Sequence, residues 1–365
     1  MNRVFKTRIT GAASAMRPVL AVAIMVIAAM FAVPALALKY AAKEHDLDAD
    51  PTIPTWVPGP LHIEPRQEFH IIGSDTMDEI TLGWVKMFRK AYPHLSVTME
   101  ARASGTGYRG LIDGKSQIAT VARELLPPEA KAFEEKFGYE ATAFRVATGS
   151  LGSLGKTAAS VILVDKDNPI KGLTMAELDA IYSTSRKRGH KEIDTWGDLG
   201  LGGDWKSRPI RLYGLQPPNG IEAYFQEVVL LGGKYRNDIE FVHGEGNTHA
   251  FTVAAEDMAN HPGGLTYAML ANLTPNVRPL PLAEKAGGPY VAPTVESVYL
   301  HTYPLSRYIY IYVNKAPGKP LEPEVKEFLR VVLSYQGQSV VAHEGVFMPL
   351  LPTVVHEELA KLSSM

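Results

Sequence analysis

Two short turns rich in hydroxyl and glycine residues stand directly before helical patterns. The first turn, "GSDTM", holds Ser74, Asp75, Thr76 and Met77, and the second, "ASGTG", holds Ser104, Gly105 and Thr106. Serine and threonine hydroxyls donate hydrogen bonds to anionic oxygens, and the amides at a helix start add the positive end of the helix dipole. Two such turns brought together would hold an oxyanion.

An arginine, Arg123, follows the predicted strand 117–122 and adds a charged donor to these two turns. Its planar guanidinium matches two oxygens of a tetrahedral anion at once. A single hydroxyl-rich turn is more often an ordinary helix N-cap. The coincidence of two turns with an arginine at a strand end therefore favours an anion site.

Other groups of polar residues give weaker evidence for a functional site. His243, Glu245 and His249 in "HGEGNTHA" could bind a metal, but a polar loop facing a cleft explains them better, and we expect no metal site. The glycine-rich stretch 149–156 lacks the spacing of a nucleotide phosphate loop. No Ser/His/Asp order, carboxylate pair or cofactor fingerprint stands out. We therefore expect neither catalysis nor a cofactor.

The elements that must position these residues alternate between strand and helix patterns. In the first part, strands are predicted at 68–73, 95–101, 117–122 and 141–147, and helices at 78–92, 108–113 and 127–137. A second part starts near 159, with helices at 174–183, 220–231 and 248–260 and strands at 208–215, 239–244, 263–269 and 276–282. A strand at 306–315 and helices at 323–334 and 352–362 follow. This alternation predicts an α/β protein with mostly parallel sheets covered by helices.

The strand at 306–315 raises two further expectations. Its alternating Tyr308, Tyr310 and Tyr312 would share one face, where packing against helices is favoured over stacking on a sugar. Arg307 precedes them, and it could either reach the cleft or form a structural ion pair.

The N-terminal end predicts export. Residues 1–17 hold four basic and no acidic residues, 19–33 is an apolar run, and Ala35-Leu36-Ala37 supplies a cleavage site. We expect a signal peptide over 1–37, with an uncleaved anchor as the alternative. Residues 38–68, with five prolines, are predicted to form an extended arm.

Charge and cysteine content exclude several classes of protein. The 365-residue chain has a formal charge of −2, which becomes −6 once the four basic residues of 1–37 are removed, so nucleic acid is not an expected partner. Without cysteine there is no disulfide and no lipid-modified cysteine. We therefore expect a freely exported protein rather than a lipoprotein.

Seven segments in this order resemble a known family. They are "GSDTM", "ASGTG", "AREL", "VILVDKDNPIKGLTMAELDAIYS", "HPGGLTYA", "YPLSRYIYIYVNK" and "EVKEFLRVVLSYQGQ". Together they resemble the phosphate-binding protein of the high-affinity phosphate ABC transporter, within the periplasmic solute-binding superfamily. The resemblance implies a two-lobed type 2 periplasmic-binding-protein fold with mixed sheets, in which a hinge joins lobe 1 (69–150 and 300–365) to lobe 2 (151–299). It also implies a periplasmic monomer that binds inorganic phosphate or a similar oxyanion and serves an ABC permease in the inner membrane.

The second lobe departs from the family pattern. Where relatives carry an arginine and a Ser-Gly-Thr turn, this chain reads "YGLQPPNGIEAYF", which places Leu215 at the arginine, Asn219 at the serine and Ile221 at the threonine. We therefore predict an asymmetric site in which the first lobe does most of the binding, while Asn219 and Gly220 close over the ligand. The alternative is a derived relative with weak or no ligand binding that acts as an accessory or interaction protein in secretion or phosphate acquisition.

Overall fold

The computed structural model describes residues 43–61, 68–217, 219–242 and 247–365. The predicted signal peptide 1–37 and two pieces of the predicted arm, 38–42 and 62–67, lie outside these ranges. The described part of the arm, 43–61, contains neither helix nor strand. No helix within the described ranges has both the length and the apolar content needed to cross a membrane.

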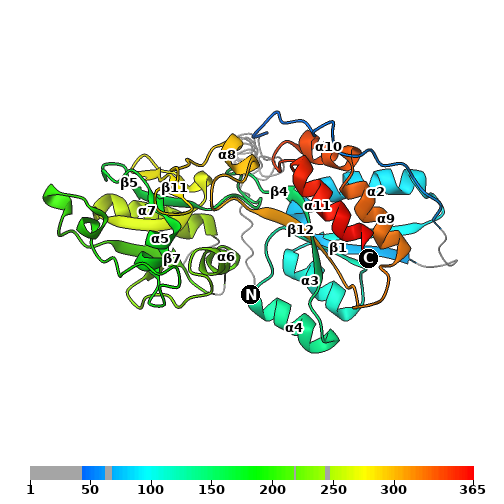
Figure 1. Ribbon diagram of the computed structural model, residues 1–365, viewed down its shortest axis with the longest axis horizontal. Coiled ribbons are helices and arrows are strands. Elements are labelled where there is room, and N and C mark those ends of the chain that lie inside the picture. The colour runs from blue at the N-terminus through cyan, green and yellow to red at the C-terminus, as the bar shows by residue number, and fades with distance from the viewer. Residues whose placement is uncertain (1–42, 62–67, 218, 243–246) are drawn as a thin grey trace, which may run out of the picture. The chain divides into compact units, whose positions relative to one another are not determined.

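The first sheet combines four strands from the start of the chain with one from near its end (Figure 1). Its order is β2 (Ser96–Arg102), β1 (Glu68–Ser74), β3 (Ile118–Val121), β12 (Tyr308–Val313), β4 (Thr142–Thr148). β1 runs parallel to β2 and β3, whereas β12 is antiparallel to both of its neighbours. The reversed strand β12 therefore joins β3 to β4.

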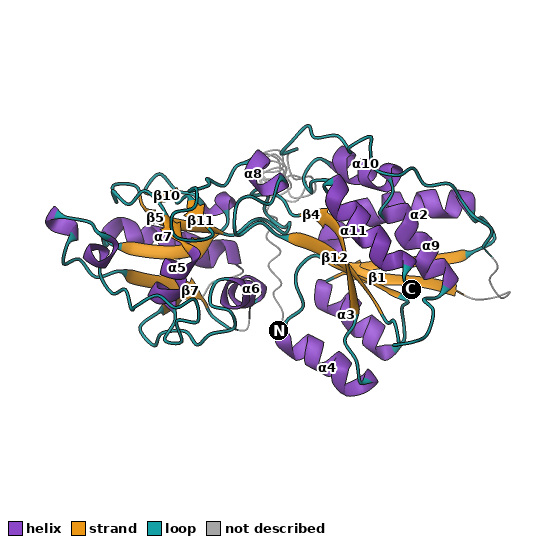
Figure 2. Cartoon of the chain, viewed as in Figure 1, coloured by secondary structure: helices purple, strands orange, loops and turns teal. Residues whose placement is uncertain are grey.

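Helices cover both faces of the first sheet (Figure 2). One face carries α2 (Asp78–Ala91), α9 (Pro323–Val332), α10 (Tyr335–Glu344) and α11 (Pro352–Ser363), and the other carries α3 (Ser104–Asp113) and α4 (Pro127–Phe137). On the first face the ring of Phe328 lies 5.5 Å from that of Phe69 and 5.4 Å from that of Phe88. These buried rings fix α2 and α9 against β1.

The three tyrosines of β12 pack as expected, although they do not share one face. Tyr310 and Tyr312 lie in the cluster formed with α3 and α4, whereas Tyr308 packs in the cluster on the opposite face. The register against β4 shifts between Ile309 and Tyr310. This irregularity interrupts the alternation on which the expectation of a common face depended.

The second sheet repeats this strand pattern. Its order is β10 (Val277–Pro279), β5 (Val161–Asp165), β9 (Gly264–Ala268), β7 (Arg211–Leu215), β8 (Glu240–Val242), with β5 as the reversed strand. Two short strands, β6 (Leu173–Thr174) and β11 (Leu282–Ala283), pair separately. Both main sheets are thus mixed, each with one strand antiparallel to its neighbours.

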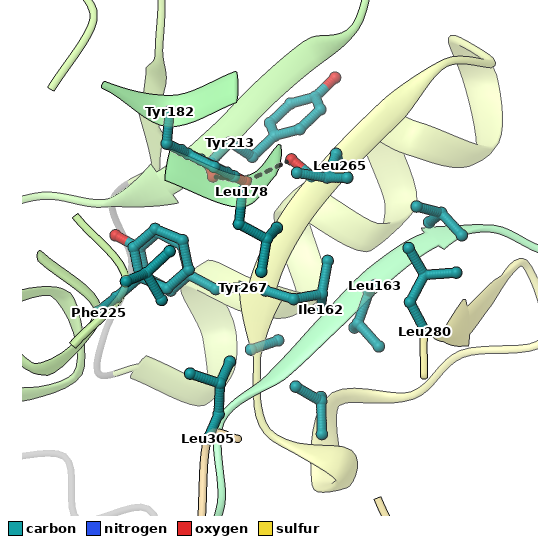
Figure 3. Packing of buried hydrophobic residues seen from close by; sticks show 14 of the residues in the cluster. Ile162, Leu163, Leu178, Tyr182, Tyr213, Phe225, Leu265, Tyr267, Leu280 and Leu305 are labelled. Atoms are coloured by element: carbon teal, nitrogen blue, oxygen red, sulfur yellow. Dashed lines mark hydrogen bonds between the residues drawn. The ribbon is translucent and has the colours of Figure 1, made fainter. Parts of the chain in front are cut away.

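The core around the second sheet also involves α5 (Met175–Tyr182), α6 (Gly220–Val228) and α7 (Asn247–Asn260). Figure 3 shows Phe225 of α6 stacked on Tyr267, with ring centroids 4.2 Å apart. The hydroxyl of the buried Tyr182 donates to the carbonyl oxygen of Leu265 at 3.0 Å. At the start of α5, the predicted capping box is confirmed, because Glu177 N donates to Thr174 Oγ1 and Thr174 N donates to the Glu177 carboxylate.

Two crossover segments, 149–160 and 300–307, connect the two sheets. They run beside each other, because Gly149 N donates to Arg307 O at 2.8 Å and Ser160 N donates to Leu305 O at 3.2 Å. Each sheet with its helices is called a lobe below. The boundaries at 150 and 299 stay predictions.

Some elements differ from the sequence-based expectation. Helix α3 begins at Ser104, four residues before the predicted start, because Gly105 and Gly107 have low helix propensity and favoured a turn. Close packing outweighs propensity here: a Cβ on Gly107 would lie 2.6 Å from Ile72 O. Helix α10 and the short α8 (Val295–Tyr299) were not predicted, since α10 opens with the polar and weakly helical "YQGQ".

Candidate functional site

A cavity of about 430 Å³ lies where both lobes and the crossover segments contribute lining residues. Five of the ten predicted site residues line it: Ser74, Thr76, Ser104, Arg123 and Gly220. The cavity is also lined by Gly155, Lys156, Thr157 and Ala158 of the first crossover and by Arg307 of the second. The two turns and the arginine singled out in the sequence therefore meet at one cavity.

The first turn supplies two hydroxyls. Strand β1 ends at Ser74, and a 3-10 turn over Asp75–Met77 leads into α2. Ser74 Oγ accepts from Thr76 N at 3.3 Å and lies 2.9 Å from Thr76 Oγ1, so the two hydroxyls are linked. Asp75 is exposed and Met77 packs in the first-lobe core, and neither lines the cavity.

The second turn supplies one hydroxyl. Ser104 Oγ accepts from Ala122 N at 3.1 Å, which ties the start of α3 to the end of β3. Thr106 N donates to Ala103 O within the first helical turn. Gly105 and Thr106 do not line the cavity, so their predicted contact with a ligand stays a prediction.

Close backbone approach brings these two turns together. A Cβ on Gly73 would lie 1.9 Å from Thr120 Oγ1 of β3, and one on Gly107 would lie 2.7 Å from the Cα of Gly73. Glycine is therefore required at both positions, since any side chain would push β1 away from β3 and α3. The glycines of both sequence motifs thus allow the close packing that positions the neighbouring hydroxyls.

Arg123 lines the cavity with its charge already balanced. Its two terminal nitrogens each lie 2.7 Å from an oxygen of the Glu129 carboxylate, and Nη1 also donates to Glu124 O at 2.9 Å. Burial raises the pKa of Glu129, but hydrogen bonds from Arg123 and Leu126 N outweigh it and hold the pKa below its usual value. Sequence reasoning assigned this guanidinium a role as an anion donor and did not predict its ion pair with Glu129.

Among the described residues, the second lobe contributes fewer polar side chains to the cavity lining than the first. Gly220 begins α6, and Asn219 caps the helix by accepting from Ile221 N at 2.9 Å. Leu215, which aligns with the arginine of relatives, is 2% exposed in the second-lobe core and is absent from the cavity lining. The position is therefore closed off by apolar packing.

No metal site emerges from the described part of the chain, which holds no suitable group of three or more His, Cys, Asp or Glu side chains. His243 and Glu245 lie outside the described residues. For His249 only the backbone, within α7, is described. The metal alternative for these three residues therefore remains untested.

Arg307 satisfies both expectations raised for it. It lines the cavity, and its Nη2 donates to Glu124 Oε2 at 2.6 Å. The side chain is only 4% exposed, and its guanidinium carbon lies 4.3 Å from the ring centroid of Tyr224. Arg307 therefore both forms a structural ion pair with Glu124 and contributes to the cavity wall.

Lys156 was missed by sequence reasoning. It lies in the Gly/Ser/Thr-rich crossover 149–160, where attention to phosphate-loop spacing set the lysine aside. The feature of the sequence that could have identified it is a single basic residue in a glycine-rich connection between two lobes. Its ammonium pairs with Glu344 at 2.6 Å. The three cations that line the cavity in the described part of the chain, Arg123, Lys156 and Arg307, are thus each paired with a carboxylate.

Comparison with known proteins places this architecture in a family. The sequence profile of the PBP superfamily domain matches residues 60–336. The chain belongs to the PBP superfamily. Membership confirms the family and the two-lobed α/β fold expected from the sequence.

Individual relatives within the PBP superfamily cover most of the chain. A phosphate-binding protein PstS from Pseudomonas aeruginosa is 36% identical over 292 residues, which cover 80% of this chain and 85% of that protein. The protein SphX from Synechococcus elongatus is 24% identical over 281 residues, 76% of each chain. A solved ABC-type phosphate transport receptor from Vibrio cholerae matches at 20% identity with a TM-score of 0.49, over 77% of this chain and 100% of that one.

Proposed function

We propose that this protein binds inorganic phosphate or a related tetrahedral oxyanion outside the cytoplasm and delivers it to an ABC permease of the inner membrane. The observation that carries this proposal is the convergence of Ser74, Thr76 and Ser104, with three cationic side chains, on one cavity. The relative at 36% identity, named a phosphate-binding protein, supports the same ligand. Capture and release of a solute require no catalytic group.

The hydroxyl orientations support binding of an anion. A hydroxyl carries one donor and two acceptor sites. Backbone amides already donate to Ser74 Oγ and Ser104 Oγ, which leaves the hydroxyl protons to be donated elsewhere. Ser104 can donate directly into the cavity, and within the linked Ser74 and Thr76 one hydroxyl proton remains for the ligand. The serine hydroxyls therefore keep donors available for an anion in the cavity.

The paired cations suit a ligand that must later be released. An anion in this cavity would meet donors on Arg123, Lys156 and Arg307 whose charges are balanced by Glu129, Glu344 and Glu124. Charge-assisted hydrogen bonds to the anion remain strong. Because every cation among the described lining residues already has a carboxylate partner, the site gains affinity from geometry rather than from excess charge.

Calorimetric titration of the exported chain with phosphate, arsenate, sulfate and phosphate esters tests this proposal. We expect saturable binding of phosphate at one site per chain. In size-exclusion chromatography the protein should elute as a monomer. Cell fractionation should place it in the periplasm with a mass lower by residues 1–37. Absence of measurable binding for all four kinds of ligand would overturn the proposal.

One observation favours the alternative function, that of an accessory protein that binds no oxyanion. The charged and hydroxyl donors expected from the second lobe are missing, and Leu215 is buried in the core. A derived accessory protein for secretion or phosphate acquisition would tolerate this loss. The titration distinguishes the two functions, because such a protein would bind its partner without any oxyanion.

A further inference from the structure

The first crossover segment brings a third wall to the cavity, beside the two turns. Gly155, Lys156, Thr157 and Ala158 all line it. The segment is fixed at its base, since Ser150 N donates to Thr157 O at 2.7 Å and the Thr157 hydroxyl donates to Ala122 O. The residue before Lys156, Gly155, has a φ of 72°, which turns the chain sharply just ahead of the lysine.

We propose that Lys156 is an anion-contacting residue of this cavity, held in position by Glu344 and by a strap formed by residues 43–56. This inference rests on the proposed function and names the cation that takes the place of the missing second-lobe arginine. The ligand class is a tetrahedral oxyanion such as phosphate.

The ammonium of Lys156 retains one donor for a ligand. It donates to Thr76 O at 3.0 Å and to Glu344 Oε1 at 2.6 Å, and its side chain is 14% exposed. A lysine ammonium has three N–H donors. No third acceptor is found for Lys156 among the described residues. Because Lys156 is bound to the turn that carries the Ser74 and Thr76 hydroxyls, its remaining N–H and these hydroxyls can meet one anion.

Glu344 fixes the ammonium rather than merely neutralising it. Its side chain is 3% exposed, and while Oε1 accepts from Lys156, Oε2 accepts from Val346 N at 3.0 Å and from Phe347 N at 2.8 Å. The ring of Phe347 also lies 5.0 Å from the Lys156 nitrogen. With both carboxylate oxygens occupied, Glu344 cannot follow a moving lysine. The end of α10 therefore holds the cation at one place.

The strap holds the same crossover from its other end. The Glu44 carboxylate accepts from Leu151 N at 2.7 Å and from Gly152 N at 3.0 Å. Its own amide donates to Gly345 O at 2.8 Å, next to Glu344. Glu44 thus ties the crossover to the turn that anchors Lys156.

Further along, the strap is anchored in both lobes. Ile53 is buried in the first-lobe core, and Leu47 packs against the second-lobe core. His45 Nε2 lies 3.0 Å from Phe347 O, which adds a bond to the turn after Glu344. Movement of the strap would therefore disturb the segment that carries Lys156.

The test compares phosphate affinity by calorimetry with thermal stability in matched variants. Lys156→Met should weaken phosphate binding at least tenfold. Lys115→Met removes one positive charge from a side chain that is 71% exposed and lies outside both the strap and the cavity lining, so it should leave the affinity within twofold. Because Lys156→Met leaves the buried Glu344 unpaired, the double variant Lys156→Met/Glu344→Gln restores neutrality. We expect it to regain thermal stability without regaining affinity.

Glu44 is tested as a positioning residue by a double-mutant cycle. Glu44→Ala should weaken phosphate binding in the parent but have no further effect in Lys156→Met/Glu344→Gln, because the effect passes through Lys156. Additive losses would overturn the positioning role of Glu44. Parental affinity in Lys156→Met/Glu344→Gln would overturn the ligand contact while leaving the proposed function intact. A parent that binds no oxyanion would overturn both.

Discussion

At the scale of single residues, Arg123 and Glu129 have opposite effects on an incoming anion. Arg123 offers donors at the cavity, while its partner carboxylate repels negative charge. Arg123→Ala removes the donors and leaves a carboxylate uncompensated, so we expect phosphate affinity to fall by one to two powers of ten, or roughly 1.5–3 kcal/mol. Calorimetry measures this directly.

The double variant Arg123→Ala/Glu129→Gln separates the two contributions. It lacks the donors but also lacks the unpaired carboxylate, so it should bind phosphate more tightly than Arg123→Ala and less tightly than the parent. If Arg123→Ala binds as well as the parent, the arginine serves only α4 and its cap. Leu215→Arg is unsuitable as a gain-of-affinity test, because it would bury a charge in the second-lobe core.

Ser104 and Thr106 form a matched pair on the same helix turn. Only Ser104 lines the cavity, and Ser104→Ala removes both a ligand donor and the acceptor for Ala122 N. We expect phosphate to bind about five- to tenfold more weakly, which corresponds to roughly 1 kcal/mol for one hydrogen bond. Because Thr106 is not among the residues that line the cavity, we expect Thr106→Ala to change the affinity by less than about twofold, and a larger loss would support the ligand contact predicted for Thr106 from the sequence. Equal effects of the two variants would contradict the placement of the second turn.

At the scale of elements, the link between α8 and β12 contains a pH-sensitive contact. His301 has a φ of 51°, stacks on Tyr308 with ring centroids 3.8 Å apart, and has Nε2 3.0 Å from Thr148 Oγ1. Burial, reinforced by the positive charge of Arg145, lowers the pKa of His301 to about 4. The folded state therefore disfavours the protonated ring.

This depressed pKa predicts acid destabilisation. The unfolded histidine, with a pKa of about 6.5, takes up its proton first, so the contribution is complete above pH 6.5 and is lost as pH falls toward 4. The loss should be about 3 kcal/mol at most. His301→Asn retains a residue that accepts positive φ and should remove this part of the pH dependence of urea unfolding. An unchanged pH dependence in the variant would contradict the assignment.

The elements also show where sequence reasoning succeeds. Strands β3 and β7 were predicted because their apolar runs are buried on both faces, and the start of α5 because its capping box is local. The start of α3 depended on contact between Gly107 and β1, which no local pattern reveals. The pairing of Arg123 with Glu129 was likewise missed, because side-chain partners depend on how α4 packs.

The site residues also divide into those that the sequence could predict and those that it could not. Hydroxyls at strand ends could be predicted, since the ends of parallel strands meet at one sheet edge. Lys156 and Arg307 reach the cavity from connections between the two sheets. Their placement depends on the tertiary arrangement of both crossovers, so composition alone gave only Arg307 as a candidate.

At the scale of the whole molecule, charge predicts how association responds to salt. Without the proposed signal peptide 1–37 the chain carries a formal charge of −6, and each cation among the described residues that line the cavity is paired with a carboxylate. The long-range field at the cavity should therefore not attract anions. We expect the association rate constant for phosphate, measured by stopped flow, to stay level or rise slightly between about 10 and 150 mM salt, as screening reduces repulsion. A steep fall with salt would show an uncompensated positive field.

The position of β12 also sets the order in which the polypeptide can acquire structure during its synthesis. β3 ends at Val121, but its neighbour β12 begins only at Tyr308, and every strand of the second sheet lies between them in the chain. A ribosome therefore releases the entire second sheet while the first still lacks β12, the strand that joins β3 to β4. Because the non-local pairing of β3 with β12 must wait, the first sheet is completed late. If the chain is exported as proposed, this order keeps the first sheet incomplete until Val313 has been made.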